Sequence, residues 1–318
     1  MNKIIENIKT ARPRLSQSSL DLYVRNLKRL NNNKVPRSLT YLNNFDKVMN
    51  LINTEMKSDA VRKTALTSIV VALKSSKRPK KDLINQYSNN MMKLVEANDI
   101  KQRQQVRTPK QEQNWLSLDE IKNIANKLFN DIKEKGIDKK DTLTISGYKL
   151  FQEYLLLRLY IEYPVRNDLS LYRIHENQQR DENKNYLIEM NNGDYVIELN
   201  KYKTSKTFGQ KRYILSKGLK KLLKIFFKHN TSPYLLTNVD RKTMLSRNSL
   251  TKTLQQIFMR EAGKKIGSSL LRHIQAFERN KDKPTIKEHE EDERKIQDTF
   301  LHNGNMNNVY SVRSNLEN

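Results

Sequence analysis

The fold of this chain is decided by residues 148–166, which read Tyr148-Lys-Leu-Phe-Gln-Glu-Tyr-Leu-Leu-Leu-Arg-Leu-Tyr-Ile-Glu-Tyr-Pro-Val-Arg166. Apolar and aromatic side chains occupy nearly every side of a helix drawn through residues 148–162, and such a helix is normally buried by its surroundings. Pro164 ends the pattern, because proline has no amide proton and clashes with the preceding turn. Arg166 is therefore expected just beyond the end of a buried central helix.

Beyond Arg166 the apolar period changes from that of a helix to that of a strand. Tyr186 to Met190 and Tyr195 to Leu199 lie on either side of Asn192-Gly193, a dipeptide typical of hairpin turns. Arg212 to Leu215 supplies a third strand after a basic loop that begins at Lys201. The pattern predicts a three-stranded antiparallel sheet, followed by helices that begin near residues 216, 248 and 268.

Ahead of the central helix, Ser117-Leu-Asp-Glu120 is a capping box, which marks the start of a helix. Residues 100–113 have no regular period and contain Pro109, so we interpret them as a linker. Residues 16–99 hold four amphipathic helical patterns. The prediction is an α+β, mainly helical chain with a small all-α domain at 1–99, a basic linker at 100–113 and a mixed domain at 114–318.

The chain is strongly basic, with 60 Lys and Arg against 35 Asp and Glu and a net charge of +25. Residues 1–113 alone hold 23 basic and 9 acidic residues, a net of +14. Such a charge indicates a polyanionic partner, and double-stranded DNA is the expected one. One basic residue on a helix face is usually just solvated, but the following set is predicted to contact the DNA backbone: Arg25, Lys28, Arg29, Arg62, Lys63, Lys74, Lys77 and Arg78, with Arg103 and Arg107 in the linker.

Several classes of protein are disfavoured by what the sequence lacks. There is no cysteine, which excludes disulfides, thiolate catalysis and cysteine–zinc sites. No apolar run approaches the roughly 18 residues of a membrane span, and no signal peptide is recognisable. We therefore expect an intracellular protein with no membrane association. No carboxylate cluster has the spacing of a metal-dependent nuclease, and neither a metal nor another cofactor is expected.

Five residues with complementary chemistry follow one another along the chain: Arg166, a lysine near position 203, Arg272, His302 and Tyr310. A tyrosine hydroxyl is a nucleophile for a phosphodiester, and guanidinium groups offer paired N–H donors to the non-bridging oxygens that gain charge. A histidine adds a donor or accepts the tyrosine proton, and a lysine protonates the leaving 5′ oxygen. The series therefore suits attack on DNA without a metal ion.

The order and context of these residues resemble the tyrosine recombinase (phage integrase) family. The likeness covers nearly the whole chain and rests on three motifs, Tyr163-Pro-Val-Arg166, Lys203-Thr-Ser-Lys206 and Ser268-Ser-Leu-Leu-Arg272-His273, followed by His302 and Tyr310. The family's usual motif is His-x-x-Arg-His, and here its first position is a serine, Ser269. The acidic residue that commonly lies three residues after the first arginine here lies two residues after it, as Asp168. These departures are typical of a virus or mobile-element lineage.

The resemblance implies a particular fold and function. Residues 1–99 would form the core-binding, SAM-like domain and residues 114–318 the catalytic domain, which together clamp the duplex. Tyr310 would be the nucleophile of a site-specific recombinase or integrase, forming a 3′-phosphotyrosine that stores the bond energy, so that rejoining needs neither ATP nor metal. The family works as a homotetramer on two DNA sites. Asp168, Ser269, Lys206 and His273 would support the catalytic residues.

Two alternatives and one assignment remain open from the sequence. A type IB topoisomerase-like enzyme would share the chemistry but relax supercoils as a monomer. A DNA-binding protein that has lost catalysis would also fit, because Ser269 cannot relay a proton as histidine does. Lys203 and Lys206 lie in the same loop, and either is a candidate for the general acid.

Overall fold

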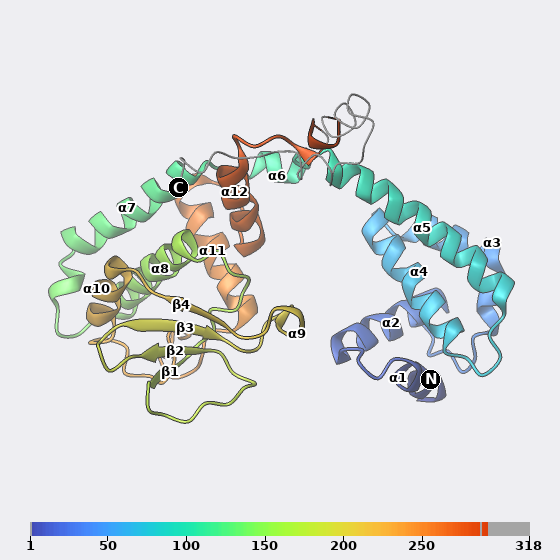
Figure 1. Cartoon of the computed structure of the whole chain (residues 1–318), viewed down its shortest axis with the longest axis horizontal. Helices are drawn as coiled ribbons and strands as arrows, with labels where there is room; N and C mark the ends of the chain where they lie inside the picture. Colours follow the sequence, from blue (N-terminus) through green and yellow to red (C-terminus); the bar gives the residue numbers. More distant parts are fainter. Residues whose placement is uncertain (1, 287, 292–318) are drawn as a thin grey trace, which may run out of the picture. The chain divides into compact units, whose positions relative to one another are not determined.

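A computed structural model describes residues 2–286 and 288–291 of the chain, which divides into two compact units (Figure 1). The first unit contains the described residues up to Val106 and those from Pro284 onward, and the second runs from Arg107 to Lys283. The described residues are mainly helical and include one β-sheet, which confirms the predicted α+β class. No helix in this part of the chain is both long enough and apolar enough to cross a membrane.

The first unit is helical in its described part. Local capping explains where several helices begin, because the Ser16, Asn44 and Ser58 side chains each accept a backbone N–H three residues later. The helix with the most buried residues in this unit, α4, contributes Leu66, Ile69 and neighbouring apolar residues to a single core. The elements are α1 (Asn2–Ala11), α2 (Gln17–Leu30), the 3₁₀ helix η1 (Thr40–Asn43), α3 (Phe45–Glu55), α4 (Asp59–Lys74) and α5 (Lys81–Arg103).

Segment 100–113 differs from the aperiodic linker that the sequence predicts. Its first residues continue α5 to Arg103, and α6 (Pro109–Gln113) follows within it. Thr108 forms a capping box with Gln111, and Pro109 occupies the first turn, where the missing amide proton costs nothing. The proline that supported the linker interpretation therefore lies at the start of a helix.

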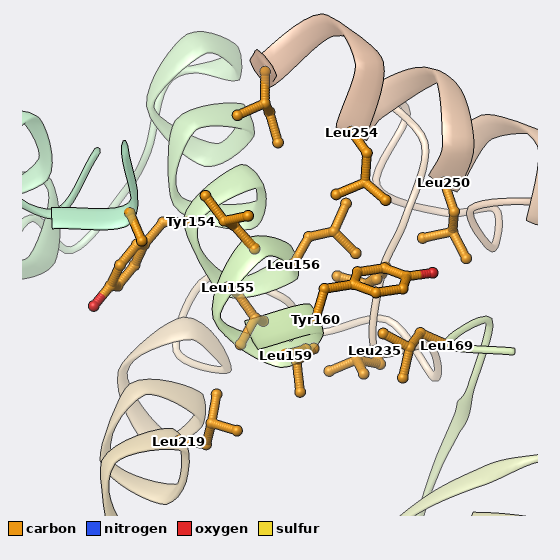
Figure 2. Close-up of a cluster of buried hydrophobic side chains, with 14 of the residues drawn as sticks. Tyr154, Leu155, Leu156, Leu159, Tyr160, Leu169, Leu219, Leu235, Leu250 and Leu254 are labelled. Carbon is orange, nitrogen blue, oxygen red and sulfur yellow. The ribbon is translucent and has the colours of Figure 1, made fainter. Parts of the chain in front are cut away.

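The second unit is built around α8 (Ile145–Glu162), the predicted central helix. Apolar residues on its successive faces pack against other elements of the unit, as Figure 2 shows for Leu155, Leu156 and Leu159. The capping box at Ser117 is present, with Glu120 Oε2 accepting the Ser117 N–H at 2.7 Å, and it starts α7 (Leu118–Glu134). The 3₁₀ helix η2 (Ile137–Lys139) connects α7 to α8.

Two polar residues on α8 are buried and bonded. Gln152 Nε2 donates to the Thr237 carbonyl oxygen at 2.9 Å, and Gln152 Oε1 accepts the Thr237 N–H at 2.8 Å. Glu153 forms an ion pair with Arg260 at 2.8 Å. Because buried polar groups are costly unless they are bonded, these contacts fix which segments can cover each face of α8.

The sheet corrects the sequence prediction, which gave three antiparallel strands. It has four strands in the order β1 (Tyr172–His175), β2 (Tyr186–Glu189), β3 (Tyr195–Leu199) and β4 (Lys211–Ile214). The three predicted strands are present and antiparallel, but β1 adds a parallel pair with β2. β1 was missed because four residues are too few to show a period, and its partner lies beyond a separate loop.

Four further helices complete the second unit. Ser216 caps α10, as expected, by accepting the Leu219 N–H. Ser246 caps α11 in the same way. Gly267 precedes α12 without a side-chain cap. Their bounds are α9 (Ser205–Phe208), α10 (Lys217–Phe226), α11 (Arg247–Ala262) and α12 (Ser268–Asn280).

Candidate active site

A cationic cavity of about 620 Å³ lies in the second unit, between the ends of several elements. Its lining comes from α6, the segment after α8, the β3–β4 loop, the N-terminal halves of α11 and α12, and the segment between these two helices. Asp168 is the one carboxylate among these lining residues. Six basic residues also line the cavity: Lys110, Arg166, Lys203, Arg247, Lys265 and Arg272. Such an excess of positive charge in a concave site favours an anionic ligand.

Arg166 is placed by backbone and side-chain contacts at the end of α8. The Tyr160 hydroxyl donates to the Arg166 carbonyl oxygen at 3.1 Å, and burial raises the pKa of this tyrosine. The next residue, Asn167, donates through Nδ2 to Thr251 Oγ1 at 2.6 Å. The turn that carries Arg166 is thus attached to α8 on one side and to α11 on the other.

Arg272 is brought beside Arg166 by a neighbour on the same helix. Buried Gln275 donates through Nε2 to the carbonyl oxygens of Tyr160 (2.6 Å) and Ile161 (3.2 Å), two of the acceptors that the end of α8 leaves without an intrahelical partner. The Gln275 side chain therefore attaches α12 to the C-terminal end of α8. Burial and the nearby charge of Arg166 lower the pKa of Arg272, which reflects two partly desolvated like charges.

Asp168 is the buried counter-charge of this cavity. Its carboxylate Oδ1 lies 2.9 Å from Arg247 Nη2, and the side chain is 7% exposed. Burial raises the pKa of Asp168, while Arg247, Arg166 and Arg272 act in the opposite direction. One carboxylate thus partly balances three arginines and leaves the cavity with a net positive charge.

The two candidate lysines of the hairpin loop differ in position. Lys203 lines the cavity, together with Ser269 and His273. Lys206 lies in the short helix α9, is exposed, and is not among the lining residues. The structure therefore brings together Arg166, Asp168, Lys203 and Arg272 but leaves Lys206 outside. His302 and Tyr310 lie outside the described residues.

Sequence reasoning missed several residues of the cavity. Arg247 makes the ion pair with Asp168, Asn167 ties the Arg166 turn to Thr251, and Lys265 adds a charge beside α12. Arg247 directly follows the cap residue Ser246, and an arginine next to a cap carries no recognisable signature. The Asp168-to-Arg247 pairing spans 79 residues of sequence and requires the fold.

The basic residues predicted to contact DNA fall into three groups in the structure: bonded or packed within the protein, half-buried, and exposed. Several already bond within the protein: Arg29 donates to the Glu55 carbonyl oxygen at 2.7 Å, and Arg103 pairs with Glu290 at 3.1 Å. Arg107 lies 3.8 Å above the Trp115 ring, so it packs within the second unit. Lys28 and Lys63 are half-buried, and the exposed members are Arg25, Lys74, Lys77 and Arg78.

Arg62 has a structural role in addition to its charge. Its Nε donates to the Met56 carbonyl oxygen at 3.0 Å, and Nη2 donates to the Asn53 carbonyl oxygen at 3.1 Å. These contacts bond the carbonyls at the end of α3. Arg62→Ala is expected to lower the free energy of unfolding by about 1–3 kcal/mol, since each such bond contributes about 0.5–1.5 kcal/mol net. Chemical unfolding of the whole chain measures this.

Arg78→Ala is the matched control for Arg62→Ala, because Arg78 is exposed after the end of α4. It should leave the free energy of unfolding unchanged. If the chain binds DNA, as the sequence predicts, Arg78→Ala should weaken that binding and make its dependence on salt less steep. An Arg62→Ala chain that unfolds at the wild-type denaturant concentration would show that the two hydrogen bonds contribute nothing.

The cationic lining of the cavity is suited to bind and polarise an anion such as a phosphodiester. In the part of the chain that the structure describes, no three His, Cys, Asp or Glu side chains gather closely enough to hold a metal ion. Arginine pairs bind the non-bridging oxygens of a phosphate, and a lysine beside them can donate a proton.

A scan against protein-family models finds no match, and no curated protein matches the chain.

Proposed function

We propose that this protein is a tyrosine-type site-specific DNA recombinase, which breaks and rejoins DNA through a 3′-phosphotyrosine. The observation that carries the proposal is the convergence of Arg166, Lys203 and Arg272 in one cationic cavity. These residues come from three segments of the chain, each chosen from the sequence for one step of the same reaction. The nucleophile, Tyr310, and its neighbour His302 are assigned from the sequence alone.

Each residue has a defined part in the proposed step. The Tyr310 oxygen forms a bond to phosphorus, the bond from phosphorus to the 5′ oxygen breaks, and Lys203 gives its proton to that oxygen. His302 accepts the proton of the tyrosine hydroxyl. Arg166 and Arg272 stabilise the charge on the non-bridging oxygens. Rejoining is the reverse, with the 5′ hydroxyl attacking the phosphotyrosine, and the energy of the broken bond is kept throughout.

The proposed partner is double-stranded DNA, bound by both units. Exposed Arg25, Lys74, Lys77 and Arg78 of the first unit would add backbone contacts to those of the cavity. Recombination between two sites further requires four active centres, so a homotetramer on two duplexes is part of the proposal. The site sequence itself is obtained by selecting bound duplexes from a random-sequence pool.

The experiment that tests the proposal compares two versions of the selected duplex. One has the normal 5′ oxygen at the cleaved phosphate and the other has sulfur at this position. Sulfur leaves readily without a proton, so Lys203→Ala should form the covalent product about 10²–10⁴-fold more slowly on the oxygen substrate but at nearly the wild-type rate on the sulfur substrate. Denaturing gels that retain protein-linked DNA give the rates.

Lys206→Ala is the matched control, because Lys206 lies outside the cavity in the same loop. It should behave as wild type on both substrates. Rescue by sulfur in Lys206→Ala instead would assign the general acid to Lys206. If the wild-type chain binds the duplex and forms no covalent product on either substrate, it is a DNA-binding protein, whereas relaxation of plasmids that lack the selected site would favour a topoisomerase.

A further inference from the structure

Arg247 connects two segments that carry other residues of the cavity. Its Nη2 lies 2.9 Å from Asp168 Oδ1 and donates to the Lys201 carbonyl oxygen at 3.1 Å. Asp168 is two residues after Arg166, and Lys201 is two residues before Lys203. One guanidinium therefore joins the turn of the first arginine to the base of the lysine loop.

The Asp168 side of this connection is firmly held. The Asp168 carboxylate is 7% exposed, whereas the Arg247 side chain is 54% exposed. Among the three arginines that lower the pKa of Asp168, Arg247 has the largest effect. The neighbouring Asn167 bonds Thr251, one turn after Arg247 on α11. The Arg166 turn thus has two attachments to the start of α11.

The Lys201 side is held from the sheet as well. Asn185 Oδ1 accepts the backbone N–H groups of Asn200 (3.0 Å) and Lys201 (2.8 Å), and Asn185 Nδ2 donates to the Lys201 carbonyl oxygen at 3.1 Å. Asn185 ties the end of β3 to the chain before β2. The Arg247 side chain connects the same Lys201 carbonyl oxygen to α11, and Arg247 itself lines the cavity.

We propose that Arg247 is a positioning residue that holds the Lys203 loop in register with Arg166. The inference rests on the proposed function and adds a residue to it. Arg247 keeps the lysine ammonium at the distance from the phosphate-binding arginines that proton transfer to the 5′ oxygen requires. A displacement of the lysine by a fraction of an ångström steeply lowers the rate of proton transfer.

The rival role is direct binding of phosphate by Arg247. Either paired donor edge of a guanidinium includes Nη2, the nitrogen that faces both Asp168 and the Lys201 carbonyl. A phosphate that bound Arg247 in a bidentate manner would therefore displace one of these two oxygens. The two roles predict different responses to the sulfur substrate, because a phosphate ligand acts on the non-bridging oxygens of both substrates.

The first measurement is the rate of covalent product formation by Arg247→Met. The variant should be slower than wild type by about 10-fold or more on the oxygen substrate, a part of the general-acid effect, and close to wild type on the sulfur substrate. Lys252→Met, at an exposed position on the same helix, should match wild type on both. Equal impairment of Arg247→Met on both substrates would overturn the positioning role in favour of phosphate binding.

The second measurement is amide hydrogen exchange in the whole chain without DNA. Arg247→Met should speed exchange in residues 201–210, and Asp168→Asn, which removes the same ion pair from the other side, should do so too. Lys252→Met should leave this segment unchanged. Unchanged exchange in Arg247→Met refutes the positioning role even if the chain cleaves DNA, whereas faster exchange in a chain that forms no covalent product refutes the proposed function alone.

Discussion

Replacement of Tyr310 by phenylalanine is expected to abolish the covalent protein–DNA product while leaving DNA affinity at the wild-type level. The reason is chemical, because phenylalanine lacks the oxygen that would bond to phosphorus and no later step can begin. The sulfur substrate should not restore the product, since a better leaving group cannot replace a missing nucleophile. Binding is measured by gel shift on the selected duplex, and the product on denaturing gels.

Tyr213→Phe is the control for this variant. Tyr213 lies in β4 and packs against the Tyr163 ring, with the ring centroids 5.8 Å apart. Its phenylalanine variant keeps that packing and should form the covalent product normally. Mass spectrometry of the linked peptide from the wild-type chain identifies the nucleophile directly, and a linkage to any tyrosine other than Tyr310 would refute the assignment.

Arg272→Lys is expected to lower the rate of covalent product formation about 10²–10³-fold on the oxygen and the sulfur substrate alike. Lysine keeps a positive charge but loses the planar pair of donors that matches two phosphate oxygens. The leaving group is not involved in this contact, so sulfur gives no rescue. The contrast with Lys203→Ala separates charge stabilisation from proton delivery within the same cavity.

Arg279→Lys is the matched control, because Arg279 is exposed in the last turn of the same helix, α12. It should leave both rates unchanged. Chemical unfolding should also show equal stability for the two variants, since the Gln275 bonds to the end of α8 are retained in each. Sulfur rescue of Arg272→Lys would contradict the role given to this arginine.

The parts of the fold that sequence predicted are those with local causes. The α7 capping box, the helix cap at Ser216 and the apolar faces of α8 are each decided by neighbours within a few residues. β1 was missed, because its parallel pairing with β2 depends on residues beyond a loop. Segment 100–113 was misjudged because Pro109 has opposite meanings inside a helix and at its first turn.

The residues of the candidate site likewise differ in whether a local sequence motif identifies them or only the fold does. Arg166 and Arg272 were selected from short motifs, and the structure places both in one cavity with Lys203. Arg247 could not be selected, since its contacts with Asp168 and Lys201 exist only after folding. The sequence also could not predict which arginines are exposed to solvent, because nothing in it distinguishes Arg62, which is bonded to two carbonyl oxygens, from exposed Arg78. The roles of the site residues stay predictions.

The Gln275 side chain that attaches α12 to α8 has an energetic consequence for the cavity. Burial and the nearby charge of Arg166 lower the pKa of Arg272, while Tyr160 and Asp168 act in the opposite direction. The Gln275 attachment thus holds α12 where the Arg272 guanidinium is partly desolvated and repelled by Arg166. The two hydrogen bonds of Gln275 to the end of α8 oppose this repulsion. If an anion binds between the two arginines, as proposed, its charge offsets their repulsion, and this relief contributes to the free energy of binding.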